Sequence, residues 1–269
     1  MADVPLMYAG LALAFGLLGG LLPIYSTSKQ NIERLKMLTA IASGIIIASA
    51  MLVVIPEGYE LASSGKQTDT LLLGGALLGG FVLMLILEGS GIGHAVHEEH
   101  HGHGDDHGHD HVHHGPAGWM LVLGLSLHAA TDGLAVGAAA ASGGVAVTAA
   151  VALAVLIHKG PAAFSLGAFS MHERENRKDS IRDVVIFSLA TPVMIIVAFY
   201  ALSDVQNSWI GLAMLFSAGT FLYVATVDTL PDIHNSETGR KAMIYVILGI
   251  LIMASILIGA DALGIGHSD

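Results

Sequence analysis

Eight long apolar runs constrain this chain more than any other feature of its sequence. A helix that crosses the hydrocarbon core of a bilayer needs about 20 predominantly apolar residues, and each run is of that length. Charged residues make up only 12% of the chain, whereas soluble domains carry about 25%. We therefore predict an all-α polytopic membrane protein with eight transmembrane helices, at about 5–25, 35–58, 70–93, 117–142, 144–171, 181–203, 208–230 and 241–263.

The spacing of glycine and proline indicates an internal repeat. In the second run Pro56 follows Gly44 by twelve residues, and in the seventh run Pro231 follows Gly219 at the same interval. The two helices cross in opposite directions in an eight-helix chain, and the short link around Ser142 predicts that the fourth and fifth runs form an antiparallel hairpin. We expect inverted three-helix repeats that flank this hairpin, a common plan in transporters. Chance recurrence of glycine and proline is the alternative.

The chain divides on this basis into four parts of one membrane domain. Residues 1–93 hold the first three helices, 94–116 form a loop, 117–171 hold the fourth and fifth helices, and 172–269 hold the last three. The loop contains ten of the 15 histidines and no Lys or Arg. Such low-complexity composition predicts disorder, and imidazoles bind zinc-like ions. We expect metal capture or sensing, with a hydrophilic linker as the alternative, by His94, His97, His100, His101, His103, His107, His109, His111, His113 and His114.

The loop charges predict the orientation of the helices. All loop lysines and arginines except Lys66 fall on one side of an eight-helix arrangement. By the positive-inside rule that side is cytoplasmic, so both termini lie outside and the His-rich loop lies inside. A basic patch for nucleic acid is absent from the sequence, which leaves the lipid bilayer and small ions as the expected partners.

Ionisable residues in the fourth and fifth runs indicate a metal site. His128 and Asp132 are four residues apart and share one helix face. His158 lies near the middle of the next run, so the hairpin brings all three side chains to similar depth. Imidazole and carboxylate ligands suit Zn²⁺ and also serve Fe²⁺, Mn²⁺, Co²⁺ and Cd²⁺. A structural His–Asp network that ties two helices together is the alternative.

Residues next to His158 bear on how this site would work. Pro161 cannot donate a backbone hydrogen bond, so we expect a kink that frees a carbonyl there. Gly133 and Gly160 allow close helix approach. Lys159 carries a charge that costs about 2.5–3.5 kcal/mol at the bilayer centre, so we expect it to pair with Asp132 or another acid such as Asp228. It either mimics a second cation or forms a helix-tying salt bridge.

A few further side chains are weaker candidates for an ion pathway. Each lies near the end of a predicted helix, where a carboxylate or imidazole would meet an ion at a pore mouth. Solvated caps are the alternative for the acids, and an inert interfacial position is the alternative for the histidines. These residues are Glu57, Asp228, Asp232, His172 and His234.

Taken together, these motifs resemble the ZIP (zinc/iron permease, Zrt-/Irt-like) family of metal transporters. The resemblance rests on His-x-x-x-Asp-Gly in the fourth helix, His-Lys-Gly-Pro in the fifth, Leu-Pro-Asp at the end of the seventh, and the His-rich loop after the third. It implies transport of zinc or a related divalent ion into the cytoplasm, by a protein that is usually dimeric. It implies no enzymatic activity.

Departures from the family pattern imply one transported ion per site. Many members hold two metals with ligands at four positions that here carry Ala129, Lys159, Ala162 and Thr191. The first-site residues are retained, so the resemblance implies that Lys159 fills the second position. The chain is similar in this to the subfamily that includes a Golgi-associated animal member and its prokaryotic relatives. We expect a plasma or inner membrane location, with an organellar membrane as the alternative.

Two other functions compete with a carrier that works by alternating access. Zinc exporters of the cation diffusion facilitator type also use His-x-x-x-Asp and a His-rich loop, but usually carry six helices. An intramembrane zinc hydrolase would hold a zinc that activates water. It would need an acid or base beside the metal, and Lys159 is a poor group for that role.

Overall fold

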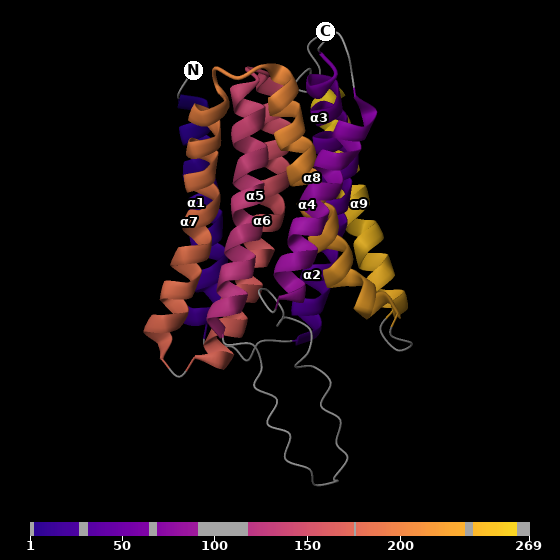
Figure 1. Cartoon of the computed structure of the whole chain (residues 1–269). Helices are drawn as coiled ribbons and strands as arrows, with labels where there is room; N and C mark the ends of the chain where they lie inside the picture. The colour runs from indigo at the N-terminus through magenta and orange to yellow at the C-terminus, as the bar shows by residue number, and fades with distance from the viewer. Residues whose placement is uncertain are drawn as a thin grey trace.

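A computed structural model of the chain consists of helices packed side by side (Figure 1). Eight spans within its described residues are long and apolar enough to cross a membrane, which confirms the predicted number of crossings. The structure describes residues 3–26, 32–64, 69–90, 118–174, 176–234 and 239–262. Its helices are α1 (Asp3–Tyr25), α2 (Ile32–Ser49), the π-helix η1 (Ala50–Val54), α3 (Ile55–Ala62), α4 (Thr70–Gly89), α5 (Gly118–Ala141), α6 (Val145–Glu173), α7 (Arg177–Leu202), α8 (Asn207–His234) and α9 (Gly239–Ala262).

The second crossing is one helix with a wider turn inside it. The elements α2, η1 and α3 follow one another without a break, and the π-helical turn Ala50–Val54 lies just before Pro56. Proline has no N–H for the carbonyl four residues earlier, so the regular α-helical pattern cannot continue unchanged into Pro56. A π turn at such a point locally changes the direction in which side chains face.

Polar caps and one glycine set the ends of several helices. The Asp69 carboxylate accepts a hydrogen bond from the Leu71 backbone N–H at 2.9 Å, which begins α4. The Asn176 side chain accepts in the same way from the Lys178 N–H at 3.0 Å, which begins α7. Gly143 adopts a φ of 81° between α5 and α6, a conformation that is open mainly to glycine. The predicted tight turn between the fourth and fifth crossings is therefore present.

The helices form two groups. In the first group, which we call the hairpin bundle, α1, α5, α6 and α7 pack against one another. The second, which we call the flanking bundle, contains α2, η1, α3, α4, α8 and α9. Figure 1 shows the hairpin bundle on the left and the flanking bundle on the right. The two meet mainly where α5 packs on α8 and where α2 packs on α6.

The helix contacts follow the symmetry expected of an inverted repeat. Such a repeat exchanges α5 with α6, α1 with α7, α2 with α8, and α4 with α9. The α5–α7 contact then has its counterpart in α6–α1, the α4–α8 contact in α9–α2, and the α5–α8 contact in α6–α2, and all of these pairs pack together. The two halves of the chain are therefore built on one packing plan.

Two close helix crossings at glycine residues follow the same symmetry. Gly44 crosses Gly249 where α2 meets α9, and Gly219 crosses Gly80 where α8 meets α4. A Cβ atom on any of these four glycines would collide with the backbone carbonyl three residues before the facing glycine. Only glycine permits helices to approach so closely. The carbonyls belong to Val246, Ile41, Leu77 and Phe216.

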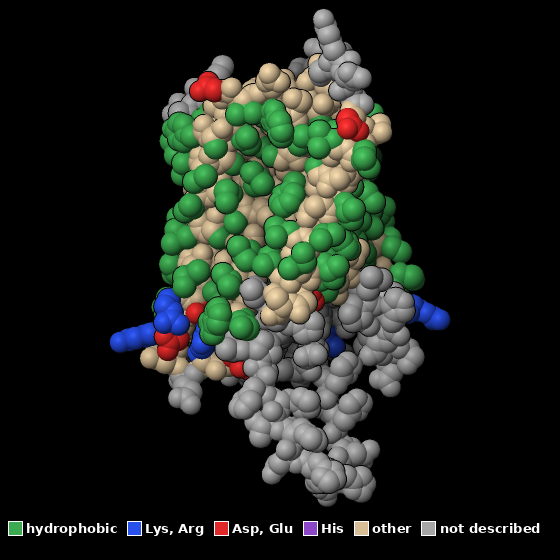
Figure 2. All heavy atoms as spheres, in the orientation of Figure 1, with side chains coloured by type: hydrophobic (Ala, Val, Ile, Leu, Met, Phe, Trp, Pro, Cys, Tyr) green, Lys and Arg blue, Asp and Glu red, His purple; other side chains and the backbone are tan. Residues whose placement is uncertain are grey.

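We distinguish two ends of the molecule. The terminal end is where α1 begins and α9 ends, at the top of Figure 1, and the loop end is where α4 ends and α5 begins. Hydrophobic side chains form a belt across the middle of the face seen in Figure 2. In that view the described Lys and Arg side chains gather at the loop end. The belt is what a bilayer would contact.

Candidate metal centre

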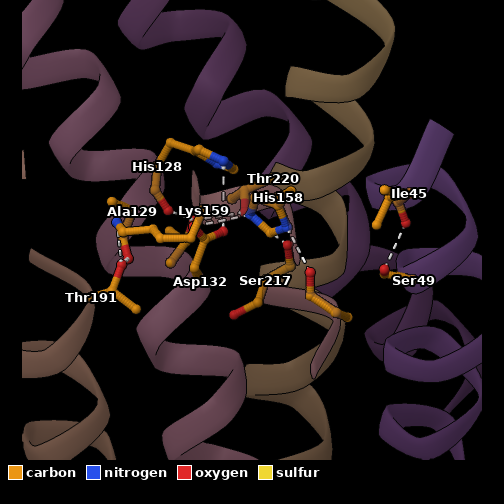
Figure 3. A network of polar contacts seen from close by, with 12 residues as sticks. Ile45, Ser49, His128, Ala129, Asp132, His158, Lys159, Thr191, Ser217 and Thr220 are labelled. Atoms are coloured by element: carbon orange, nitrogen blue, oxygen red, sulfur yellow. Dashed lines mark hydrogen bonds and ion pairs between the residues drawn. The ribbon is translucent and has the colours of Figure 1, made fainter. Parts of the chain in front are cut away.

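Three of the residues singled out in the sequence come together between α5 and α6. His128 and Asp132 project from α5 and His158 projects from α6 (Figure 3). One ligand atom of each lies within 4.8 Å of those of the other two, and the three residues are only 1–3% exposed. Within the described part of the chain, this is the one cluster of its kind.

The Asp132 carboxylate lies between the two imidazoles. Its Oδ2 is 3.3 Å from His158 Nε2, and its Oδ1 is 3.6 Å from His128 Nε2. Oδ1 has no hydrogen-bond donor although it is buried. A buried carboxylate oxygen without a donor is costly unless a positive charge compensates it. The carboxylate is therefore well placed to take up a cation.

The hydrogen bond on the far side of His158 fixes which nitrogen would bind a metal. Nδ1 lies 2.9 Å from the Ala154 carbonyl oxygen, so Nδ1 carries the hydrogen and donates it. In the neutral ring the lone pair is then on Nε2, which faces the Asp132 carboxylate. Two lone-pair atoms at 3.3 Å repel each other unless a cation lies near both. Backbone orientation of this kind is typical of metal-binding histidines.

The flanking bundle closes one side of the cluster with Phe221. The Phe221 ring is fully buried, and its centroid lies 6.2 Å from that of His128 and 6.1 Å from that of His158. Both ring pairs meet edge to face at 73°. Phe221 therefore restricts the orientation of both imidazoles at once. Sequence reasoning missed it, because a phenylalanine in an apolar run is not distinguishable from any other core residue.

Lys159 points away from the three ligands. Its Nζ donates to Thr191 Oγ1 at 2.7 Å, lies 3.5 Å from the Phe187 carbonyl, and sits 3.8 Å from the centroid of the Phe187 ring. The expected ion pair with Asp132 is wrong. Successive residues on a helix face about 100° apart, so Lys159 turns toward α7 when His158 turns toward α5. Among the described side chains, no carboxylate lies within ion-pair distance of Lys159 Nζ. The carboxylate of Asp228, the other expected partner, is not among the described side chains.

The positions that depart from the family pattern lie around Lys159. Thr191 donates its hydroxyl hydrogen to the Ala129 carbonyl at 2.7 Å, which leaves an oxygen lone pair to accept from Nζ. Ala129 is fully buried, and Ala162 packs against the cluster that contains it. The ammonium group thus lies among three of the four helices of the hairpin bundle, α5, α6 and α7, and links them.

Three residues were expected to shape the helices at this site, and the structure shows a different arrangement at each of them. Helix α6 continues through Pro161 to Glu173 as a single helix. Gly133 faces the Thr191 carbonyl so closely that a Cβ atom would collide with it. Gly160 has open space where its side chain would be, but its own carbonyl lies against Gly19. Close helix packing therefore occurs on both sides of the site.

Of the five pathway candidates, the structure describes the side chain of Glu57 alone. Glu57 is half-buried in the first turn of α3 at the terminal end. The backbone of His172 lies in the last turns of α6, and those of Asp228, Asp232 and His234 lie in the last turns of α8. The side chains of these four lie outside the described residues, as do the ten loop histidines from His94 to His114.

The fold and the cluster define a class: a polytopic helical membrane protein whose midsection holds a buried three-residue site suited to a divalent ion. A family model described as ZIP Zinc transporter matches residues 3–114 and 89–257. The chain belongs to this family.

Individual relatives agree with the family match. The chain is 31% identical to "Zinc transporter ZIP9" of Xenopus tropicalis, over 89% of this chain and 92% of the relative. It is 32% identical to "Zinc transporter ZIP9" of Micropogonias undulatus, over 78% and 79%. A further match, "Zinc transporter foi" of Drosophila melanogaster, is 35% identical over 58% of this chain and 22% of that protein. These matches do not favour an exporter of the cation diffusion facilitator type or a hydrolase.

Proposed function

We propose that the protein transports Zn²⁺ across the membrane and binds it with His128, Asp132 and His158. The observation that carries the proposal is the group of three buried ligand atoms within 4.8 Å of one another. Two imidazoles and one carboxylate are a ligand set typical of zinc, and three protein ligands leave a position open for water and exchange. Fe²⁺, Mn²⁺, Co²⁺ and Cd²⁺ suit the same ligands and are the competing substrates.

The site holds one ion at a time, and Lys159 takes the place of a second. Its ammonium group is buried beside Thr191 and Phe187. Thr191 and the residue to which it is hydrogen-bonded, Ala129, are two of the positions that depart from the family pattern. A fixed positive charge there repels a second cation and has a hydroxyl and an aromatic ring as partners. Lys159 therefore places a positive charge in the bundle beside the metal site.

Transport runs toward the loop end, which is cytoplasmic. The described Lys and Arg side chains in Figure 2 lie at that end, as the positive-inside rule requires of the cytoplasmic side. Both termini are then outside, and the His-rich loop captures or senses zinc in the cytoplasm. The membrane is the plasma or inner membrane, or that of an organelle, and the functional unit is a homodimer.

The carrier works by alternating access between the two bundles. The half of the core toward the terminal end is tightly filled with apolar side chains from both bundles, including Val54, Met214, Val136 and Val151. An ion cannot pass through such packing, so this conformation is closed toward the terminal end. Movement of the bundles against each other would open it, as in other carriers built from inverted repeats.

Zinc flux into proteoliposomes tests the site. We expect uptake of radioactive zinc by the wild type, and loss of uptake in His128→Ala, His158→Ala and Asp132→Asn. The matched control is Asp204→Asn, which removes an exposed carboxylate between α7 and α8. Undiminished uptake by the three site variants would rule out the site.

Metal stoichiometry tests the number of ions. A chain that lacks residues 94–114 should bind one zinc ion per protomer in equilibrium dialysis, and His158→Ala in this background should bind none. Two ions per protomer in the shortened chain would contradict the role of Lys159.

A further inference from the structure

A hydrogen bond joins the two bundles beside the metal cluster. Thr220 of α8 belongs to the flanking bundle, and its hydroxyl lies 2.9 Å from the Thr131 hydroxyl on α5 of the hairpin bundle (Figure 3 labels Thr220). The other polar contacts near the site, those of Lys159 and Asp132, stay within the hairpin bundle. Elsewhere apolar residues of both bundles, among them Ala135 and Ala218, share one buried core cluster.

The Thr131 hydroxyl is also hydrogen-bonded to the backbone of a metal-site residue. It lies 2.7 Å from the His128 carbonyl and donates its own hydrogen there, so its oxygen lone pair is free to accept from Thr220. A chain of two hydrogen bonds thus runs from α8 to the backbone of His128. Through this chain, the position of α8 is connected to the helix turn that presents both α5 ligands.

Thr220 also has a second acceptor within its own helix. The Ser217 carbonyl lies 2.7 Å from the same hydroxyl oxygen. A hydroxyl has one hydrogen to donate, and it can rotate between two acceptors. If α8 moves away from α5, the hydrogen turns to Ser217 and no buried donor is left unpaired. Breaking the contact between bundles therefore costs far less than stranding a buried polar group would.

We propose that Thr220 and Thr131 form a reversible latch that positions the flanking bundle against the metal site and sets how much of the protein occupies this conformation. The proposal rests on the alternating-access transport proposed above. A bond that must open in every cycle has to be weak, and the Ser217 acceptor makes it so. Thr220 is a positioning residue: it acts through Thr131 and does not bind the ion.

The latch predicts a measurable change in conformational population. A neutral hydrogen bond contributes about 0.5–1.5 kcal/mol net, which corresponds to about a 2- to 12-fold change in an equilibrium constant. Thr220→Val removes the hydroxyl and keeps the side-chain shape. It should shift the population away from this conformation by up to that factor, because the contact with the Ser217 carbonyl is lost in both conformations. Thr220→Ser keeps the hydroxyl and should restore the wild-type population. The control is Thr226→Val, because the hydrogen bonds of the Thr226 hydroxyl to described residues stay within its own helix, on the carbonyls of Leu222 and Tyr223.

Distances between the bundles report the population directly. The chain has no cysteine, so cysteines introduced at Ser64 and Ser203 can carry the only spin labels. Both residues are exposed at the terminal end, one at the end of α3 and the other at the end of α7. Pulsed electron resonance of the full chain in lipid nanodiscs would give the distance distribution for the wild type and the three Thr variants.

The outcomes separate this proposal from the proposed function. We expect a changed distribution and a changed maximal uptake rate in Thr220→Val, with wild-type behaviour in Thr220→Ser and Thr226→Val. In the chain that lacks residues 94–114, Thr220→Val should still bind one zinc ion per protomer. A wild-type distribution in Thr220→Val would overturn the latch, and so would loss of zinc binding, because the residue would then be part of the site itself. Absence of zinc uptake by the wild type would overturn the proposed function. The distance measurement would still report whether Thr220 changes the conformational population.

Discussion

Replacing Gly44 with alanine should force two helices apart. The added Cβ atom would collide with the Val246 carbonyl oxygen and would lie 3.1 Å from the Gly249 Cα atom. Both neighbours are backbone atoms of α9, so neither can rotate away as a side chain would. The helices α2 and α9 must separate to make room, and every contact along their crossing weakens.

The cost can be set against a matched control. Overpacking of a tight interface costs about 1–3 kcal/mol, whereas glycine to alanine in a helix with free space gains about 1 kcal/mol. Gly74 on α4 has nothing within 4 Å of the position of an added Cβ. Gly44→Ala and Gly74→Ala should therefore differ by about 2–4 kcal/mol in stability. Gly219→Ala should behave like Gly44→Ala, because Gly219 occupies the equivalent position in the other repeat.

Unfolding of the purified protein in mixed micelles by increasing sodium dodecyl sulfate, followed by circular dichroism, would measure these free energies. We expect Gly44→Ala and Gly219→Ala to unfold at similar and lower detergent fractions than the wild type. Equal stability of Gly44→Ala and Gly74→Ala would refute the close crossing. A large difference between Gly44→Ala and Gly219→Ala would refute the equivalence of the repeats.

Three further changes test the hairpin bundle and its neighbour with the same unfolding assay. Thr191→Val should cost about 1.5–3 kcal/mol because the Lys159 ammonium loses its shortest hydrogen bond, and Thr191→Ser should not; equal stability would show that the bond contributes nothing. Asp183→Asn should cost a similar amount, since this buried carboxylate accepts hydrogen bonds of 2.8 Å from Ser170 and Arg174; a wild-type midpoint would argue against that pair. Phe221→Ala should cost about 3–5 kcal/mol and weaken zinc binding in titration calorimetry, whereas unchanged affinity would mean that the ring does not orient the imidazoles.

Much of the fold follows from properties that repeat along the chain. The number of sufficiently long apolar runs gives the number of crossings. The short link at Ser142 requires the two helices that it joins to pack antiparallel. The matching Gly44–Pro56 and Gly219–Pro231 intervals also predicted an internal repeat, and the helix contacts follow its symmetry. These features depend on local sequence and need no knowledge of neighbours.

The candidate site was predictable only where its members lie on the same or adjacent helices. Spacing brings His128 and Asp132 to one face, and the hairpin brings His158 to them. The direction of Lys159 was not foreseen, because it depends on which helix packs on each side of α6. Thr220 and Phe221 carry no signal in a run of apolar and small residues, and their contacts arise from the meeting of two bundles.

The π-helical turn in the second crossing makes the two repeats less alike than their sequences suggest. Gly44 and Pro56 are twelve residues apart, as are Gly219 and Pro231. One extra residue within a helical turn rotates everything beyond it by about 100°. The turn Ala50–Val54 introduces such an offset into the first repeat, whereas α8 is α-helical throughout Asn207–His234. Equal spacing in sequence thus gives unequal phase in space, so the side chains beyond this turn point in directions that the other repeat does not reproduce.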